Sequence, residues 1–352
     1  MPISIPERYV FVEDLAPGGM SSVALYQDIN LDRNVAIKVI SPGKHYRRAF
    51  DEIAALERLR SDYVLDVFDV LVDNDTREIG IVQEYLDGRD LADHIKKHKT
   101  SAGENLRIIF QISTGVADIH SAGVVHRDIK PQNLRLLPDE RIVIFDFGLA
   151  RMIENGGQTT GFVGSIPYAA PELFKDGLVM FDESVDVYAI GAVAFRLATG
   201  STLPAVDKRF ATPQVIAADA VGNSAEVAAL LTRALDIDPA RRPTAAELRN
   251  ACERELLRDR HRALLVHEGT TYTISAENRN ISLRVGNTSV LQITYNGLDF
   301  IVTNVEGRVL RNNSTVAAGD VLEGSLVFTF GGEAGPYRVY VPFDISHPEV
   351  IA

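Results

Sequence analysis

Two stretches near the middle of the chain place carboxylates beside strongly apolar runs. In "VVHRDIKPQNLRLL" (124–137), Asp128 and Asn133 are five residues apart with Lys130 between them. In "IVIFDFGLAR" (142–151), Asp146 directly follows a strand-like apolar run. A proton acceptor, an ammonium group and an amide on one loop, with a second carboxylate on the next, are groups that bind phosphate and hard metal ions. The first stretch is expected to form one rigid loop, and Asp146 is expected to lie at the end of a hydrophobic strand.

The pattern of apolar residues divides the chain into three parts. Residues 8–40 are typical of short strands, residues 45–60 have the apolar spacing of one helix face, and two more strand-like runs follow. From 91 to 262 the pattern is mostly helical, and the charged join 253–266 is also expected to be helical. Residues 267–352 return to short strands separated by Asn/Gly turns, which predicts a small all-β domain.

Composition narrows the class of protein and its partners. With 352 residues, 46% of them hydrophobic and 24% charged, the chain suits two or three globular folding units. A net charge of −12 disfavours binding to nucleic acid or anionic lipid, and the single cysteine, Cys252, excludes an internal disulfide framework. The N-terminus has no secretory-signal pattern, and the most apolar run (187–195) is shorter than the ~20 residues that span a bilayer. We therefore expect a cytoplasmic protein without nucleic-acid or membrane partners.

Six motifs follow one another in a fixed order along the chain. They are "VAIK", a helix with a central glutamate, "HRDIKPQN", "DFG", "APE" and a late "RRPT". Together they resemble the eukaryotic-type (Hanks-type) Ser/Thr protein kinase family, including its bacterial members, over residues 8–262. The resemblance implies an α+β, bilobal kinase domain over 1–262, with a β-rich N-lobe (about 1–86) and an α-rich C-lobe (about 87–262). A β-sandwich over 263–352 is expected to follow.

The resemblance implies a role for each polar group of the two central stretches. Asp128 would orient the substrate hydroxyl and accept its proton, and Lys130 would neutralise charge on the γ-phosphate of ATP. Asn133 and Asp146 would hold Mg²⁺ (or Mn²⁺), because a hard cation prefers oxygen ligands. The implied cofactors are therefore ATP and a divalent metal ion.

The resemblance also implies a nucleotide site built largely by the N-lobe. Lys38 would bind the α- and β-phosphates, and Glu52 would hold Lys38 in place. The implied nucleotide-binding residues are Leu15, Gly18, Gly19, Val23, Ala36, Lys38, Glu84, Leu86 and Arg135. Arg135 stands where the family usually has an apolar residue under the adenine, and its alkyl stem can still cover a ring. Only the middle glycine of the family's G-x-G-x-x-G-x-V pattern is kept, because Ala16 and Ser21 stand at the other two positions. We expect weaker or slower use of ATP rather than none, because the remaining Gly-Gly pair still allows the backbone to approach phosphate.

Other matches to the family are structural. Glu172 in "APE" and Arg242 in "RRPT" are expected to form a buried ion pair, which is costly to break by removing one partner. Asp186 is expected to bind the backbone of the catalytic loop. His126 and Phe147 are expected to pack together between the lobes rather than to act as acid or base.

Two features predict the substrate class and a mode of activation. By the same resemblance, Lys130, and Ser165 just before "IPYAAPE", imply protein substrates with Ser or Thr hydroxyls. Arg127 precedes the catalytic Asp and would bind a phosphate on the activation segment, where Thr159 and Thr160 are the candidate autophosphorylation sites. The alternative is that both threonines are ordinary loop hydroxyls.

The C-terminal segment has its own weak resemblance. Residues 307–331 resemble forkhead-associated (FHA) domains through a strand, an Asn-rich turn, "GD" and a final strand. Phosphothreonine binding in that family needs an Arg after a Gly and a Ser-x-x-His motif, whereas here Arg284 precedes Gly286 and no such motif occurs. We expect a homodimer or partner-protein interface, or a structural cap. The alternative to an active kinase is a pseudokinase scaffold that signals through this β domain.

Overall fold

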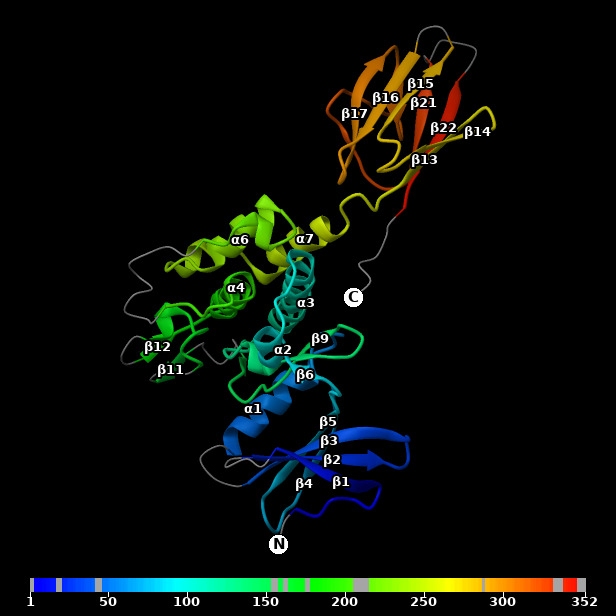
Figure 1. The fold of residues 1–352 in the computed structure, drawn as a ribbon. Coiled ribbons are helices and arrows are strands. Elements are labelled where there is room, and N and C mark those ends of the chain that lie inside the picture. Colours follow the sequence, from blue (N-terminus) through cyan, green and yellow to red (C-terminus); the bar gives the residue numbers. More distant parts are fainter. Residues whose placement is uncertain are drawn as a thin grey trace. The chain divides into compact units, whose positions relative to one another are not determined.

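The chain divides into two units in the computed structural model, Met1–Cys252 and Glu253–Ile351 (Figure 1). The structure describes residues 3–16, 21–41, 46–152, 158–160, 164–174, 178–204, 215–286, 289–331 and 338–346. Within these ranges, no helix combines the length and the apolar character needed to cross a bilayer.

A five-stranded antiparallel sheet begins the first unit. Its order is β1-β2-β3-β5-β4, formed by β1 (Tyr9–Ala16), β2 (Ser21–Asp28), β3 (Arg33–Ile40), β5 (Ile79–Glu84) and β4 (Val67–Val72), and α1 (Tyr46–Glu57) lies between β3 and β4 in sequence. The β-branched residues of β3 favour a strand and are buried on both faces. Val35 and Ile37 pack with Tyr9, while Ile40 packs with Ile79 on the other face. This packing fixes the strand that carries the lysine of the predicted site.

The rest of the first unit is mainly helical. Its elements are α2 (Leu91–Lys97), α3 (Ala102–Ser121), η1 (Pro131–Asn133), η3 (Pro171–Phe174), α4 (Ser184–Thr199), η4 (Ala218–Ala220), α6 (Ala225–Ala234), η5 (Pro239–Arg241) and α7 (Ala245–Leu256), which crosses the unit boundary. Ser101 and Glu104 form a capping box at the start of α3. Ser224 caps the start of α6 and accepts a hydrogen bond from Val227 N, and Gly200 ends α4 with φ of 71°. Local sequence signals therefore set these helix ends.

Short strands position the two loops that carry the carboxylates. The short strands are β6 (Arg89–Asp90), β7 (Val124–Val125), β8 (Leu134–Leu136), β9 (Ile142–Ile144), β10 (Arg151–Met152), β11 (Gln158–Thr160) and β12 (Leu178–Met180). The pairs β6–β8, β8–β9, β7–β10 and β11–β12 are antiparallel. The loop between β7 and β8 therefore lies beside the loop between β9 and β10. Phe145 N donates a hydrogen bond to Asn133 O across them at 3.1 Å.

The second unit is a sandwich of two β-sheets. Their orders are β14-β13-β22-β21-β18-β19 and β15-β16-β17-β20. The strands are β13 (Ala263–His267), β14 (Thr270–Ile274), β15 (Asn280–Val285), β16 (Ser289–Tyr295), β17 (Phe300–Glu306), β18 (Val309–Arg311), β19 (Ser314–Thr315), β20 (Val321–Leu322), β21 (Leu326–Phe330) and β22 (Val339–Ile345). Alternate residues of both sheets form one core, in which the rings of Tyr295 and Phe300 stack 4.6 Å apart.

The predicted α+β fold class is confirmed, with strands first, helices next and an all-β part last. One local expectation is wrong: the charged join 253–266 is helical only as far as Leu256. Its last residues form β13, because pairing with β14 and β22 overrides the local helical pattern. The FHA-like character of this unit and its role in interaction or dimerisation stay predictions.

Candidate active site

A buried carboxylate from α4 anchors the loop that follows β7. Asp186 accepts hydrogen bonds from the backbone N of His126 at 2.8 Å and of Arg127 at 2.7 Å. Its Oδ2 also lies 3.0 Å from His120 Nε2. Burial opposes the charge on Asp186, yet the hydrogen bond with His120 and the neighbouring donors outweigh burial and lower its pKa. The predicted contact of Asp186 with the loop backbone is therefore present, with the carboxylate ionised.

His126 and Phe147 join the two loops through a ring contact. Their centroids are 4.6 Å apart in an edge-to-face arrangement, and both side chains are buried. Asp128 N donates to His126 Nδ1 at 3.3 Å. Burial lowers the pKa of His126, so the ring is neutral at pH 7. The predicted packing of His126 against Phe147 is present. The imidazole is buried and its Nδ1 accepts a backbone hydrogen bond, so it is not available as a base.

Two non-glycine residues of these loops adopt the left-handed backbone conformation. Arg127 has φ of 67° and Asp146 has φ of 64°. Such conformations cost about 1–3 kcal/mol each and persist only where the surroundings hold them. Arg127 is held because its Nε donates to Leu149 O at 2.7 Å and its guanidinium lies 4.6 Å from the Phe181 ring centroid. The fold therefore imposes the strained backbone at the two predicted polar loops.

Asp128 is the acceptor of a dense hydrogen-bond cluster. Lys130 Nζ donates to its Oδ2 at 2.7 Å, and Ser165 Oγ donates to its Oδ1 at 2.9 Å. Lys130 Nζ also donates to Ser165 Oγ at 2.9 Å, which closes a triangle. Asn133 Nδ2 donates to Asp128 Oδ2 at 3.0 Å and to its backbone O at 2.9 Å. The structure thus brings together three residues that the sequence places on one loop, and adds Ser165 from a distant segment.

Lys38 from β3 meets Asp146 from the second loop. The distance from Lys38 Nζ to Asp146 Oδ1 is 3.4 Å. Burial opposes the charge on Asp146, but the nearby Lys38 ammonium group outweighs it and the pKa of Asp146 is lowered. About half of the Asp146 side chain, 48%, remains exposed, so an ionised oxygen faces the open site. The side chain of Glu52 lies outside the described residues, and its ion pair with Lys38 stays a prediction.

A cavity of about 410 Å³ adjoins Lys38 and Asp146. It is lined by Leu15, Val23, Ala36, Lys38, Leu65, Gln83, Glu84, Tyr85, Leu86, Gly88, Arg135, Phe145 and Asp146. Every predicted nucleotide-binding residue that the structure describes is in this lining, whereas Gly18 and Gly19 lie outside the described residues. A cleft of this volume, lined by apolar residues and a few charged groups, is typical of a small-ligand site.

Sequence reasoning missed several of the lining residues. Phe145 immediately precedes Asp146, so its place beside the site was available from the sequence. Leu65 carries no such signal, because it reaches the cavity only through the hydrogen bond from its N to Ile144 O, at 3.0 Å. Gly88 is required by close approach: a Cβ there would lie 2.4 Å from Leu136 O.

Arg135 lies in the cavity wall at the position where the family usually has an apolar residue. Its Nη1 lies 2.7 Å from Asp90 Oδ1, and its guanidinium carbon is 5.0 Å from the Phe145 ring centroid. The charged head is therefore held by Asp90, and the alkyl stem can cover an apolar ring as the sequence predicts.

The predicted metal ligands have chemistry that fits a hard divalent cation. Asn133 uses only its Nδ2 for the hydrogen bonds to Asp128, so its Oδ1 has no donor among the described residues. Asp146 offers an ionised and partly exposed carboxylate. No cluster of three or more His, Cys, Asp or Glu side chains suited to a metal occurs in the described part of the chain. Two oxygen ligands are enough for Mg²⁺ where phosphate and water complete the shell.

A bidentate ion pair ties the segment after Ser165 to the helical core. Arg242 Nη1 donates to Glu172 Oε1 at 2.7 Å, and Arg242 Nη2 donates to Glu172 Oε2 at 2.8 Å. Arg242 also donates to the backbone O of Ser184 and of Asp236. The predicted pair of Glu172 and Arg242 is therefore present and buried.

The candidate phosphorylation sites lie on β11. The backbone of β11 pairs with β12, with Thr159 opposite Val179 and Thr160 opposite Leu178. The side chains of Thr159 and Thr160 lie outside the described residues, so their modification stays a prediction.

Comparison with known proteins finds relatives among the protein kinases. The chain is 31% identical over 207 residues to mitogen-activated protein kinase 14 of Xenopus laevis, a match that covers 56% of each protein. It is 33% identical over 204 residues to the serine/threonine-protein kinase PrkC of Bacillus subtilis (strain 168), covering 56% of this chain and 31% of that relative. The match thus spans about half the length of the first relative and about a third of the length of the second. The protein kinase domain family matches residues 9–252, a range that includes every loop of the site, and the chain therefore belongs to this family.

Proposed function

We propose that the chain is an ATP- and Mg²⁺-dependent Ser/Thr protein kinase, which transfers the γ-phosphate of ATP to protein Ser and Thr hydroxyls. One observation carries the proposal: the loop of Asp128, whose carboxylate accepts from Lys130 Nζ at 2.7 Å, is hydrogen-bonded to the loop of Asp146, which pairs with Lys38 beside a cavity of about 410 Å³. Membership of the protein kinase family supports the same reaction. The site combines a proton acceptor with cations and oxygen ligands for a phosphate donor.

The proposed roles follow from what phosphoryl transfer requires. Catalysis of this reaction is mainly positioning and stabilisation of charge on the phosphoryl oxygens. Asp128 orients the acceptor hydroxyl and takes its proton, while Lys130 presents its ammonium group to the transferred phosphoryl group. Ser165 Oγ bonds both Asp128 and Lys130, and this supports a hydroxyl-bearing acceptor beside the same two groups.

The nucleotide would lie in the cavity with its phosphates toward Lys38. Lys38 would bind the α- and β-phosphates, with Glu52 as its proposed partner on α1. Bound Mg²⁺ would be held by Asp146 and by Asn133 Oδ1 and would offset charge on the phosphates. Residues Leu15, Val23, Ala36 and Leu86 supply apolar contact for the adenine ring.

The proposal is tested by phosphate transfer with the full chain. The chain is incubated with γ-³²P-labelled ATP, Mg²⁺ and histone as a general acceptor protein, and labelled amino acids are separated after hydrolysis. We expect label on phosphoserine and phosphothreonine with Mg²⁺, and none with excess EDTA. Absence of label from both the chain and the histone, at every enzyme concentration tried, contradicts the proposal.

We also propose autophosphorylation at Thr159 or Thr160. Arg127 supports this, because its buried guanidinium is fixed to Leu149 O at 2.7 Å, in the segment that leads toward β11. A phosphate carries about −1.5 to −2 charges at pH 7 and orders a loop when it meets an Arg. Mass spectrometry after incubation with ATP and Mg²⁺ should find phosphate on this segment. The double variant Thr159→Ala/Thr160→Ala should lose it, whereas the exposed control Thr303→Ala should keep it; an unmodified segment in the unaltered chain rules the proposal out.

A further inference from the structure

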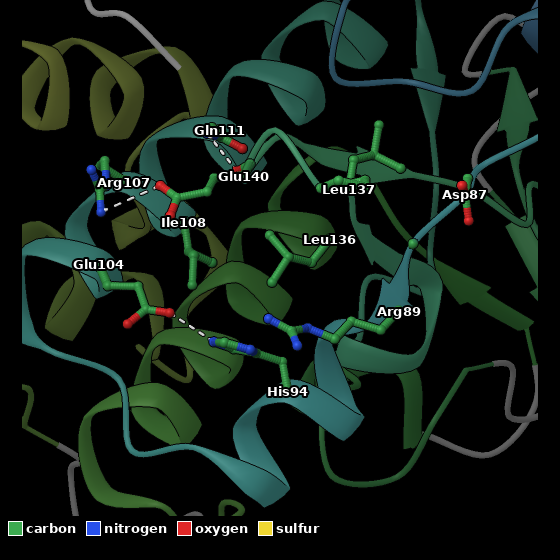
Figure 2. A pocket seen from close by; sticks show the side chains of 12 residues that line it. Asp87, Arg89, His94, Glu104, Arg107, Ile108, Gln111, Leu136, Leu137 and Glu140 are labelled. Carbon is green, nitrogen blue, oxygen red and sulfur yellow. Dashed lines mark hydrogen bonds and ion pairs between the residues drawn. The ribbon is translucent and has the colours of Figure 1, made fainter.

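A second cavity, of about 450 Å³, lies against the strand pair β6–β8 (Figure 2). In this ribbon Arg89 pairs with Leu136, and Asp90 pairs with Arg135. Because successive side chains of a strand point to opposite faces, the first pair and the second pair face opposite sides. Arg89 and Leu136 line the second cavity, whereas Arg135 lines the nucleotide cavity. The ribbon is therefore a wall shared by the two cavities.

The floor of the second cavity is apolar. Ile108 on α3 is 4% exposed and Leu136 on β8 is 9% exposed. Gln111 also lines the cavity, but both ends of its amide are occupied: Nε2 donates to Glu140 O at 3.3 Å and Oε1 accepts from Ile142 N at 2.5 Å. The floor therefore offers apolar contact and no free amide.

Some of the charged side chains around this floor have an ion-pair partner, and others have none among the described residues. His94 Nε2 lies 2.7 Å from Glu104 Oε1, and Arg107 Nη2 lies 3.7 Å from Glu140 Oε2. Arg89, by contrast, makes no ion pair or side-chain hydrogen bond with any residue that the structure describes. In Figure 2 its side chain extends across the cavity toward His94 and away from Asp87. Asp87 likewise makes no ion pair with a described residue, but the Arg89 side chain is turned away from it, so the cavity presents a guanidinium without an opposite charge beside it above an apolar floor.

We propose that this cavity binds a small organic carboxylate with an apolar body, whose carboxylate pairs with Arg89. A planar guanidinium matches a carboxylate through two parallel hydrogen bonds. A phosphate dianion suits the site less, because the carboxylates of Asp87, Glu104 and Glu140 also line it. A volume of about 450 Å³ is in the range of small-ligand sites.

The shared wall couples this site to nucleotide binding. Gly88 lines both cavities, and a Cβ on it would lie only 2.4 Å from Leu136 O, so β6 and β8 are in tight contact. A ligand that repositions Arg89 acts on the same two-residue strand as Asp90, which holds Arg135 at 2.7 Å in the nucleotide cavity. The carboxylate is therefore an effector of nucleotide affinity, and the coupling is reciprocal.

Binding is tested on the full chain with three probes: benzoate, phenylacetate and 4-methylpentanoate. Saturation-transfer NMR and calorimetry should detect at least one of them with a dissociation constant of roughly 1 mM or tighter. Phenylacetamide, which lacks the charge, and phenyl phosphate should bind at least about tenfold more weakly than the carboxylate that binds best. The proposal is overturned if no carboxylate binds at a concentration about tenfold above 1 mM, or if phenylacetamide binds as tightly as the carboxylates.

Variants locate the probe. Arg89→Gln should weaken binding at least about tenfold, Arg89→Lys should lie between it and the unaltered chain, and the exposed control Arg241→Gln should bind normally. Arg89 is exposed, and a thermal melt verifies that the variants fold. Undiminished binding by folded Arg89→Gln places the ligand elsewhere and overturns the site.

Coupling is measured as the dissociation constant of a fluorescent ATP analogue with and without saturating carboxylate. We expect a change of at least about threefold in the unaltered chain and none in Arg89→Gln. An unchanged constant in the unaltered chain overturns the effector role. Neither the binding measurement nor the coupling measurement needs phosphate transfer. A negative result in either of them is therefore distinct from failure of the proposed kinase activity.

Discussion

Asp128→Ala is expected to lower the rate of phosphate transfer to histone by about 10²–10⁴-fold, the usual contribution of a positioned general base. Asp128 is the only acceptor shared by Lys130, Ser165 and Asn133 within the described site, so its loss also releases the groups around it. Nucleotide affinity should change less than about threefold, because the cavity is lined by other residues. Initial rates with labelled ATP and binding of a fluorescent ATP analogue measure the two effects separately.

A second substitution separates proton transfer from local disorder. Asp128→Asn keeps the shape and one acceptor oxygen for Lys130 but cannot accept a proton, so we expect a loss of transfer similar to that of Asp128→Ala. The matched control is Asp93→Ala, an exposed carboxylate on α2, which should transfer at the normal rate. Equal rates for the unaltered chain and both Asp128 variants would show that Asp128 is not the base.

The sequence predicts the site well where its groups are close along the chain. Asp128, Lys130 and Asn133 come from one turn between two strands, and their mutual distances are fixed once β7 and β8 form. Strand β3 is likewise predicted by its β-branched residues, and it carries Lys38 to Asp146 on the neighbouring loop. Local pattern and family resemblance agree at these positions, so the prediction needs little knowledge of the remaining fold.

Contacts between distant segments were less accessible to sequence reasoning. Leu65 enters the nucleotide cavity because the backbone near it bonds to Ile144, 79 residues away. The second cavity depends on the two-residue strand β6, which is too short to produce a periodic pattern. The join before β13 carries a helical pattern, and only pairing with two other strands makes its end extended. The short strands, and the strands with which they pair, could therefore not be predicted from the sequence.

Glu172→Ala is expected to lower the free energy of unfolding of the first unit by about 3–5 kcal/mol. The Arg242 side chain is fully buried, with 0% exposed, and its two hydrogen bonds to Glu172 are 2.7 and 2.8 Å long. Without Glu172 the guanidinium keeps only backbone oxygens as acceptors and has no opposite charge beside it. Urea unfolding followed by circular dichroism at 222 nm measures the change, since the described helices lie between Tyr46 and Leu256.

The neighbouring residue provides a matched control. Arg241 is 72% exposed and lies 3.7 Å from Asp238, so Arg241→Ala should cost only about 0–1 kcal/mol. The double variant Glu172→Leu/Arg242→Met should recover most of the loss, because it leaves no buried charge without a partner. If Glu172→Ala costs no more than Arg241→Ala, the buried pair does not stabilise the unit. If the double variant is stable but transfers phosphate slowly, the pair instead serves to position the segment that carries Ser165 against Asp128.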